Sequence, residues 1–323
     1  MTATGTATRP APRARPHATY RHEAVLHAGD EEFLAVAVDF VGEGTAAGQP
    51  VLVVLPPRRA ALLVEALVDP GPDVHVLDLT RAGPPGQLIG LWREFLDEER
   101  HRGRPLRGLA EGVHARQRSD ERLECELQDA LLALAVEPDT PFWLRCLYDT
   151  AALPARAVAA AEQSHPVCVA VDGTHRGSTS YGGAHRARTL LAEALPAPPD
   201  ARVEVTFGPG ELGDVRAVVA RLAHLAGLPH GRAADLELAV HELASNTVRH
   251  AGGHGLLRLW RHPDDVVCEV ADPGCLEDPL AGRVHPALDA TGGRGLWLVH
   301  QLCDLVQVRS GPGGTTVRVT ARL

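Results

Sequence analysis

The stretch Asp235-Leu-Glu-Leu-Ala-Val-His-Glu-Leu-Ala-Ser-Asn-Thr-Val-Arg-His-Ala251 decides the fold of the C-terminal half of the chain. Glu242 and Asn246 are one helical turn apart in it, at the margin of a stripe that recurs at helical spacing. Gly252 and Gly253 then offer a left-handed cap. The stretch therefore predicts an amphipathic helix whose edge can line a pocket. The positions of the stripe are Leu236, Ala239, Val240, Leu243 and Thr247.

Composition restricts the classes of protein to consider. The chain has 323 residues, 45% of them hydrophobic and 23% charged, which is enough for two globular domains. The net charge is −9 and the arginines are scattered, so we expect no direct contact with nucleic acid. No lysine occurs, and all 32 basic residues are arginine. Mechanisms that need a lysine amine, such as the P-loop and the Schiff base, are therefore excluded.

The cysteines and the N-terminus indicate the compartment. The six cysteines form no C-x-x-C pair, and a chain of this length does not need disulfides to fold. The first residues lack an apolar signal segment, and no apolar run approaches the length of a membrane span. We expect a soluble cytoplasmic protein with no membrane contact. Among the 17 histidines no pair at ligand spacing has an evident third partner, so we expect surface or capping roles for most of them.

Patterns along the chain predict four regions. Residues 1–20 are rich in Thr, Ala, Pro and Arg and are expected to be a disordered tail. In residues 21–170 short apolar runs alternate with helical stretches, which is typical of an α/β domain with a mainly parallel sheet. Residues 171–200 are rich in Gly, Ser and Pro and are predicted to be a linker. In residues 201–323 helices precede most strands, which favours an α+β sandwich with helices on one face of a mixed sheet.

Four short motifs in the C-terminal region occur in an order that suggests a nucleotide site. They are Glu242-x-x-x-Asn246, Asp272-x-Gly274, Gly292-Gly-Arg-Gly295 and Gly314-Thr315-Thr316. Each motif alone is common by chance. Together they supply an amide oxygen for a hard metal ion, a carboxylate that can accept from an amino group, and backbone N–H groups at a helix N-terminus for phosphate.

The ordered motifs resemble the boxes of the GHKL, or Bergerat-fold, ATP-binding domains. The short stretch between boxes and the lack of a long lid are most similar to the anti-sigma-factor serine/threonine kinases. This resemblance implies ATP and Mg²⁺ as cofactors. The strings that strengthen it are DPLAGR (278–283), RGLWLVHQLCDLVQVRS (294–310) and GTTVRV (314–319).

The resemblance also implies roles for matching residues. Glu242 is expected to be the catalytic base that orients or deprotonates the attacking hydroxyl. Asn246 is expected to coordinate Mg²⁺, and Asp272 to accept from the adenine amino group. Arg294 either touches phosphate or is an ordinary solvated arginine. The other expected nucleotide contacts are Gly274, Gly293, Gly295 and Thr316.

Residues 21–168 resemble the MEDS sensory domain of bacterial regulators. The resemblance implies an unknown small-molecule signal. Cys146, Tyr148 and Asp149 end a predicted strand, where parallel sheets tend to bind ligands, but a buried thiol and a Tyr–Asp hydrogen bond are the preferred explanation. The matching text is FVGEGTAAGQPVLVVLPP (40–57), LECELQDALLAL (123–134), CLYDTAALP (146–154) and His165-Pro166.

Together these features predict a two-domain regulator. The kinase resemblance implies transfer of the γ-phosphoryl group of ATP to a serine or threonine of an anti-sigma-factor antagonist of the STAS type, with sequestration of a sigma factor as another output. A histidine kinase is disfavoured because no dimerising helical hairpin with a phosphorylatable histidine precedes the ATP-binding region. A non-catalytic ATP-dependent switch and an ATPase that drives dimer closure stay open, as does homodimerisation.

Overall fold

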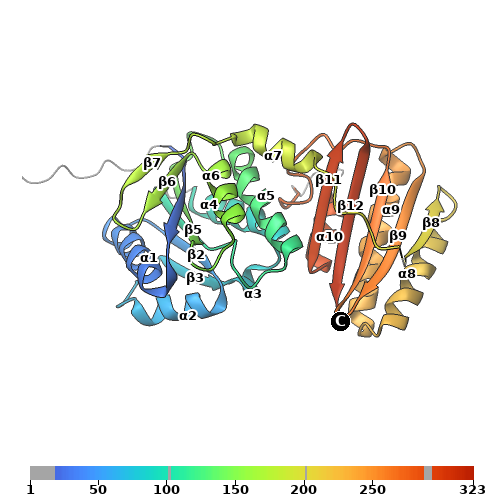
Figure 1. The fold of residues 1–323 in the computed structure, drawn as a ribbon, viewed down its shortest axis with the longest axis horizontal. Coiled ribbons are helices and arrows are strands. Elements are labelled where there is room, and N and C mark those ends of the chain that lie inside the picture. The colour runs from blue at the N-terminus through green and yellow to red at the C-terminus, as the bar shows by residue number, and fades with distance from the viewer. Residues whose placement is uncertain (1–18, 101–102, 201, 287–292) are drawn as a thin grey trace, which may run out of the picture.

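A computed structural model describes residues 19–100, 103–200, 202–286 and 293–323, which form two sheets with their helices (Figure 1). The predicted disordered tail lies almost entirely outside these residues. Within the described part of the chain, no helix combines the length and hydropathy that a membrane span requires.

The first sheet has seven strands in the order β3-β2-β4-β5-β1-β6-β7. All neighbouring pairs are parallel except β6 and β7. This arrangement confirms the predicted α/β fold with a mainly parallel sheet. Its strands are β1 (Arg21–His27), β2 (Val51–Leu55), β3 (Val74–Asp78), β4 (Leu106–Ala110), β5 (Phe142–Asp149), β6 (Val167–Ala170) and β7 (His175–Gly177).

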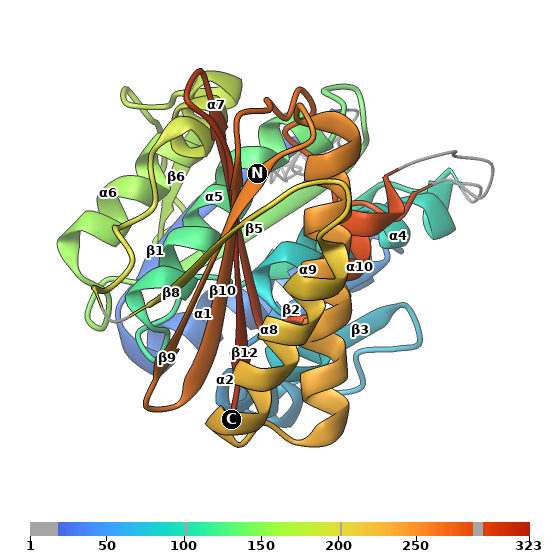
Figure 2. The ribbon, with the colours of Figure 1, turned by 90° about the vertical axis from the view of Figure 1, so that its right-hand side faces the viewer.

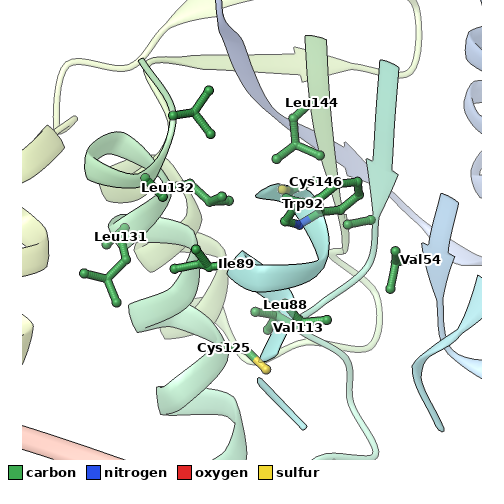
Figure 3. Close-up of a cluster of buried hydrophobic side chains, with 14 of the residues drawn as sticks. Val54, Leu88, Ile89, Trp92, Val113, Cys125, Leu131, Leu132, Leu144 and Cys146 are labelled. Carbon is green, nitrogen blue, oxygen red and sulfur yellow. The ribbon is translucent and has the colours of Figure 1, made fainter. Parts of the chain in front are cut away.

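Helices cover this sheet on both faces. All five residues of β2 are buried and apolar, as expected for a central parallel strand. Figure 3 shows one of the two cores, a buried cluster to which α4 contributes Trp92 and Ile89, α5 contributes Leu131, and β5 contributes Leu144. The helices of this half are α1 (Gly29–Ala46), α2 (Pro57–Ala66), α3 (Leu79–Ala82), η1 (Pro85–Gln87), α4 (Leu88–Arg100), α5 (Ser119–Ala135) and α6 (Ala155–Ser164).

The segment predicted as a linker, residues 171–200, contains regular structure. It includes β7, which pairs with β6, and α7 (Gly183–Ala192). Three side chains of α7 are buried in the core that Figure 3 shows in part, namely Ala187, Leu190 and Leu191. The Gly- and Ser-rich composition suggested a flexible connection, but these apolar residues at helical spacing pack against α5.

The second sheet has five strands in the order β11-β12-β10-β9-β8. Three helices cover one of its faces, which confirms the predicted α+β sandwich. One detail differs, because all pairs in this sheet are antiparallel rather than mixed. Two-residue connections join β9 to β10 and β11 to β12, and such short hairpin loops permit only antiparallel pairing. The elements are β8 (Val203–Phe207), α8 (Leu212–Ala226), α9 (His230–His250), β9 (Gly255–His262), β10 (Asp265–Asp272), α10 (Arg294–Leu302), β11 (Leu305–Gly311) and β12 (Gly314–Arg322).

The two halves contact each other. In Figure 1 the first half of the molecule lies beside the β11 edge of the second sheet, and Figure 2 shows α8, α9 and α10 on one face of that sheet and not on its second face. On that second face Gln307, Arg309 and Thr320 are buried although they are polar. Both α7 and η1 contact β11. The polar face of the C-terminal sheet is therefore partly an interface within the chain.

Candidate functional site

Helix α9 places Glu242 and Asn246 at the edge of its buried face. Leu236, Val240 and Leu243 of this helix are buried, whereas Glu242 and Asn246 are half-buried. Asn246 is the single asparagine in a chain of 323 residues. Among the described residues, neither the amide of Asn246 nor the carboxylate of Glu242 has a hydrogen-bond or ion-pair partner. Both groups are therefore available to a ligand.

The N-terminus of α10 lies directly against these two side chains. Gly293 caps the helix with a φ of 85°. A Cβ atom at Gly295 would lie 2.8 Å from Oε2 of Glu242 and 3.3 Å from Nδ2 of Asn246. The first turn of a helix carries unsatisfied N–H groups and a partial positive charge. The carboxylate, the amide and the glycine turn therefore meet in space, as their order in the sequence predicted.

Asp272 ends β10 and is held by two hydrogen bonds. Thr247 Oγ1 donates to Oδ2 of Asp272 at 2.7 Å, and the backbone N–H of Gly274 donates to Oδ1 at 2.9 Å. A Cβ atom at Gly274 would lie 2.6 Å from Cβ of Ala251, so only glycine lets the chain pass so close to α9. The sequence analysis assigned Thr247 to the buried side of the helix but missed its contact with Asp272. The only indication of this contact in the sequence was that a residue with a hydroxyl group directly follows Asn246.

The structure places Thr315, rather than the predicted Thr316, on the side of β12 that faces the cavity. Thr315 pairs with Asp272 across the sheet, and its hydroxyl donates to the carbonyl of Gly274 at 2.8 Å. Thr316 points to the opposite face of the sheet, beside Pro196 and Arg318. Successive side chains of a strand point to opposite faces of the sheet. A sequence alignment that is shifted by one residue therefore assigns the role to a side chain on the opposite face.

A cavity of about 240 Å³ joins most of these residues. Its wall is largely apolar, with Leu243, Val270 and Val308 among its members. Glu242 lies just outside it, against Gly295, and Arg294 is exposed. A larger hollow of about 550 Å³ between the two halves contains none of the predicted site residues. Five predicted residues line the smaller cavity, namely Asn246, Asp272, Gly274, Gly293 and Gly295.

This constellation has a counterpart among known protein families. Residues 205–321 match the family model of the histidine kinase-like ATPase domain. Residues 21–166 match the model of MEDS, the methanogen/methylotroph DcmR sensory domain. The chain joins a MEDS domain to a histidine kinase-like ATPase domain. Both resemblances seen in the sequence are thus confirmed, and the cavity between α9, α10 and β10 belongs to the ATPase domain.

The chain is also similar to solved structures of individual proteins. The chain is 22% identical to the RsbU and RsbW domains of Rv1364c from Mycobacterium tuberculosis, with a TM-score of 0.30. The match covers 39% of this chain and 32% of that chain. No curated protein matches.

The MEDS domain contacts the ATPase domain through a buried carboxylate. Glu124 of α5 is fully buried and accepts from Nη2 of Arg283 at 2.7 Å and from Nη1 of Arg309 at 3.1 Å. Arg309 belongs to β11, and Arg283 directly follows Gly282, which lines the cavity. A carboxylate of the MEDS domain therefore holds the residue that directly follows the cavity wall.

A second contact reaches α10. The ring of His300 lies so close to η1 that a Cβ atom at Gly86 would be 1.9 Å from Nδ1 of His300. Gln87 Nε2 donates to the backbone carbonyl of His300 at 2.7 Å. Burial lowers the pKa of His300 well below its usual range, and nearby Arg283 adds to this effect. The helix that begins at the cavity thus ends against the MEDS domain.

Proposed function

We propose that this protein is an ATP-dependent protein serine/threonine kinase of the anti-sigma-factor kinase type, controlled by its MEDS domain. The observation that carries the proposal is the meeting of Glu242, Asn246 and the glycine turn of α10 beside one cavity. Such a site offers a base, a ligand for a hard cation and a phosphate-binding helix end within a few ångströms. Phosphoryl transfer depends mainly on positioning and charge stabilisation by groups of this kind.

The residues present fit Mg-ATP. Asp272 would accept from the adenine amino group, since Thr247 and Gly274 hold its carboxylate at the cavity wall. A cavity of about 240 Å³ has room for the base but not for the whole nucleotide, so the phosphates would extend to the first turn of α10. Asn246 would hold the Mg²⁺, which neutralises charge on the phosphates when bound.

Glu242 would act on the protein substrate. Its carboxylate stands at the N-terminus of α10, where the terminal phosphate is expected, and it has no partner among the described residues. From there it can accept the proton of an incoming serine or threonine hydroxyl and align that hydroxyl for attack. The partner we propose is an antagonist protein of the STAS type, and sequestration of a sigma factor is a second output of the same domain.

Contacts between the two domains support a regulatory role for the MEDS domain. Glu124 binds Arg283 next to the cavity, and Gly86 and Gln87 contact the far end of α10. A change in α5 or η1 would therefore alter both the cavity wall and the helix that receives phosphate. We propose that a signal at the MEDS domain changes nucleotide binding or transfer in this way. The six free cysteines are consistent with action in the reducing cytosol.

The test combines calorimetry with Mg-ATP and transfer of label from γ-labelled ATP to STAS-type antagonists from the same source. We expect Asn246→Ala to abolish nucleotide binding. We expect Glu242→Gln to retain binding and to lose about 10²–10⁴-fold in transfer rate. Glu237→Gln makes the same chemical change on the same helix outside the cavity and should leave both unchanged.

The outcomes separate the candidate functions. Label on an antagonist that disappears in the Glu242 and Asn246 variants supports the kinase. Nucleotide binding without transfer to any antagonist would contradict the kinase and identify an ATP-dependent switch. Hydrolysis without a partner, rising steeply with protein concentration, would indicate an ATPase that drives dimer closure.

A further inference from the structure

Four potential metal ligands meet inside the MEDS domain, and none of them lines the nucleotide cavity. His22 comes from β1, Asp129 from α5, Cys146 from β5, and His165 follows α6. One ligand atom from each lies within 4.8 Å of all the others. His22, Cys146 and His165 are buried, and Asp129 is half-buried. The sequence analysis expected no histidine ligand set, because these residues are separated by up to 143 positions, the distance from 22 to 165.

The spacing of the ligand atoms suits a tetrahedral ion. Sγ of Cys146 is 3.4 Å from Nε2 of His22 and 4.0 Å from Oδ1 of Asp129. A tetrahedral zinc site has Zn–S bonds of about 2.3 Å and Zn–N bonds of about 2.0 Å, which place adjacent ligand atoms about 3.6 Å apart. The cluster therefore needs only a small contraction to hold an ion.

Neighbouring groups already orient two of the ligands. Nδ1 of His165 lies 2.8 Å from the carbonyl of Ala161, so Nδ1 carries the proton and Nε2 has a free lone pair. Nε2 of His165 is buried and has no partner in the described part of the chain. Tyr148 donates to Oδ2 of Asp129, which leaves Oδ1 facing Cys146. Backbone and side-chain groups that fix ligands in this manner are typical of metal sites.

Burial disfavours the charged form of all four side chains while no ion is bound. Burial lowers the pKa of His22, and it lowers the pKa of His165 to about 4, so both rings are neutral as ligands must be. Burial raises the pKa of Cys146 above its usual range and that of Asp129 to about 7. A bound divalent ion would displace these protons and balance the two negative charges of the resulting thiolate and carboxylate.

We propose that His22, Asp129, Cys146 and His165 bind one divalent transition-metal ion of the zinc class. One thiolate, two imidazoles and one carboxylate favour a borderline ion such as Zn²⁺ over the hard ions Mg²⁺ and Ca²⁺. The ion ties α5 to β1, β5 and the end of α6. Because α5 also carries Glu124, the site lies on the helix that contacts the ATPase domain. The proposal does not depend on any activity of that domain.

The test uses the untagged full-length chain, stripped of metal with a chelator and titrated with Co²⁺ as a spectroscopic probe for Zn²⁺. We expect one equivalent to bind and to produce a thiolate-to-cobalt charge-transfer band. The band should be absent in Cys146→Ala and present in Cys168→Ala, a buried cysteine of the same domain, and in Cys275→Ala, an exposed cysteine. His165→Gln should weaken binding more than about 100-fold, and exposed His185→Gln should not.

A measurement on the unmodified protein keeps the proposal testable if a variant fails to fold. X-ray absorption of the zinc-loaded chain should show one sulfur at about 2.3 Å and three nitrogen or oxygen atoms at about 2.0–2.2 Å. Zinc without a sulfur neighbour would overturn the proposal. So would a chain that binds no Co²⁺, or a charge-transfer band that survives in Cys146→Ala.

Discussion

At the scale of single residues, the site depends on how Asp272 is held. Its two carboxylate oxygens each accept one hydrogen bond, from the Thr247 hydroxyl and from the Gly274 N–H. These bonds fix the plane of the carboxylate at the cavity wall. A carboxylate fixed in this way can discriminate a base by its exocyclic amino group, because the interaction requires a defined direction.

We therefore expect Thr247→Val to weaken binding of Mg-ATP by about 10- to 150-fold, the equivalent of about 1.5–3 kcal/mol for a hydrogen bond to a charged group. Calorimetry measures the affinity, and thermal unfolding shows whether the domain remains folded. Thr316→Val is the matched control on the opposite face of β12, and it should bind normally. Equal loss in both variants would contradict the role assigned to Thr247.

At the scale of elements, the start of α10 is the critical feature. Gly295 is the second residue of this helix, and its lack of a side chain lets Glu242 and Asn246 approach the first turn. Gly213 occupies the same position in α8, but a Cβ atom there would meet no atom within 4 Å. Replacing Gly295 therefore tests whether close approach to Glu242 and Asn246 is required. Replacing Gly213 shows the effect on stability of removing a glycine from a helix where no neighbour is close.

We expect Gly295→Ala to weaken binding of Mg-ATP at least about tenfold, or about 1.4 kcal/mol. The added Cβ would lie 2.8 Å from Oε2 of Glu242, so the carboxylate must move and the N–H groups become less accessible. Gly213→Ala should leave binding unchanged and stabilise the protein by about 0.4–1 kcal/mol, since alanine reduces the entropy of the unfolded chain. Calorimetry and denaturant unfolding check both. Unchanged affinity in Gly295→Ala would argue against phosphate at this helix end.

At the scale of the whole molecule, Glu124 connects the two domains. Its carboxylate is fully buried between Arg283 and Arg309, which are themselves 2% and 9% exposed. Removing one partner of a buried ion pair leaves the remaining charge without compensation. Glu121 on the same helix also reaches the ATPase domain, through Arg322, but the side chain of that arginine is 55% exposed. The helix therefore offers a buried and an exposed contact with the same partner domain.

Glu124→Gln should lower the free energy of unfolding by about 3–5 kcal/mol, because two buried guanidinium groups lose their carboxylate. We also expect it to change the affinity for Mg-ATP, since Arg283 adjoins the cavity. Glu121→Gln should change stability by at most about 1 kcal/mol, as is usual for exposed ion pairs. Denaturant unfolding and calorimetry provide the measurements. Similar effects in both variants would show that the buried contact has no special part in joining the domains.

Much of the nucleotide site could be predicted from the sequence. Glu242 and Asn246 share a helix, and their placement on one edge follows from helical periodicity alone. Gly293 and Gly295 likewise predict the start of α10 from the local sequence alone. The buried runs of Val51–Leu55 and its neighbours likewise fixed the α/β class, because apolar periodicity reflects which faces are covered. The domain boundaries and the catalytic roles stay predictions.

Only the tertiary structure decided which residues from distant segments meet. It placed Thr315 rather than Thr316 beside Gly274, joined Thr247 to Asp272, and put Glu124 between two arginines of the other domain. It also gathered two histidines, a cysteine and an aspartate from four separate elements. Local spacing determines which side of a helix or strand a residue occupies, but the order in which strands and helices pack determines its neighbours. That order depends on contacts between residues far apart in the chain, and no short pattern encodes it.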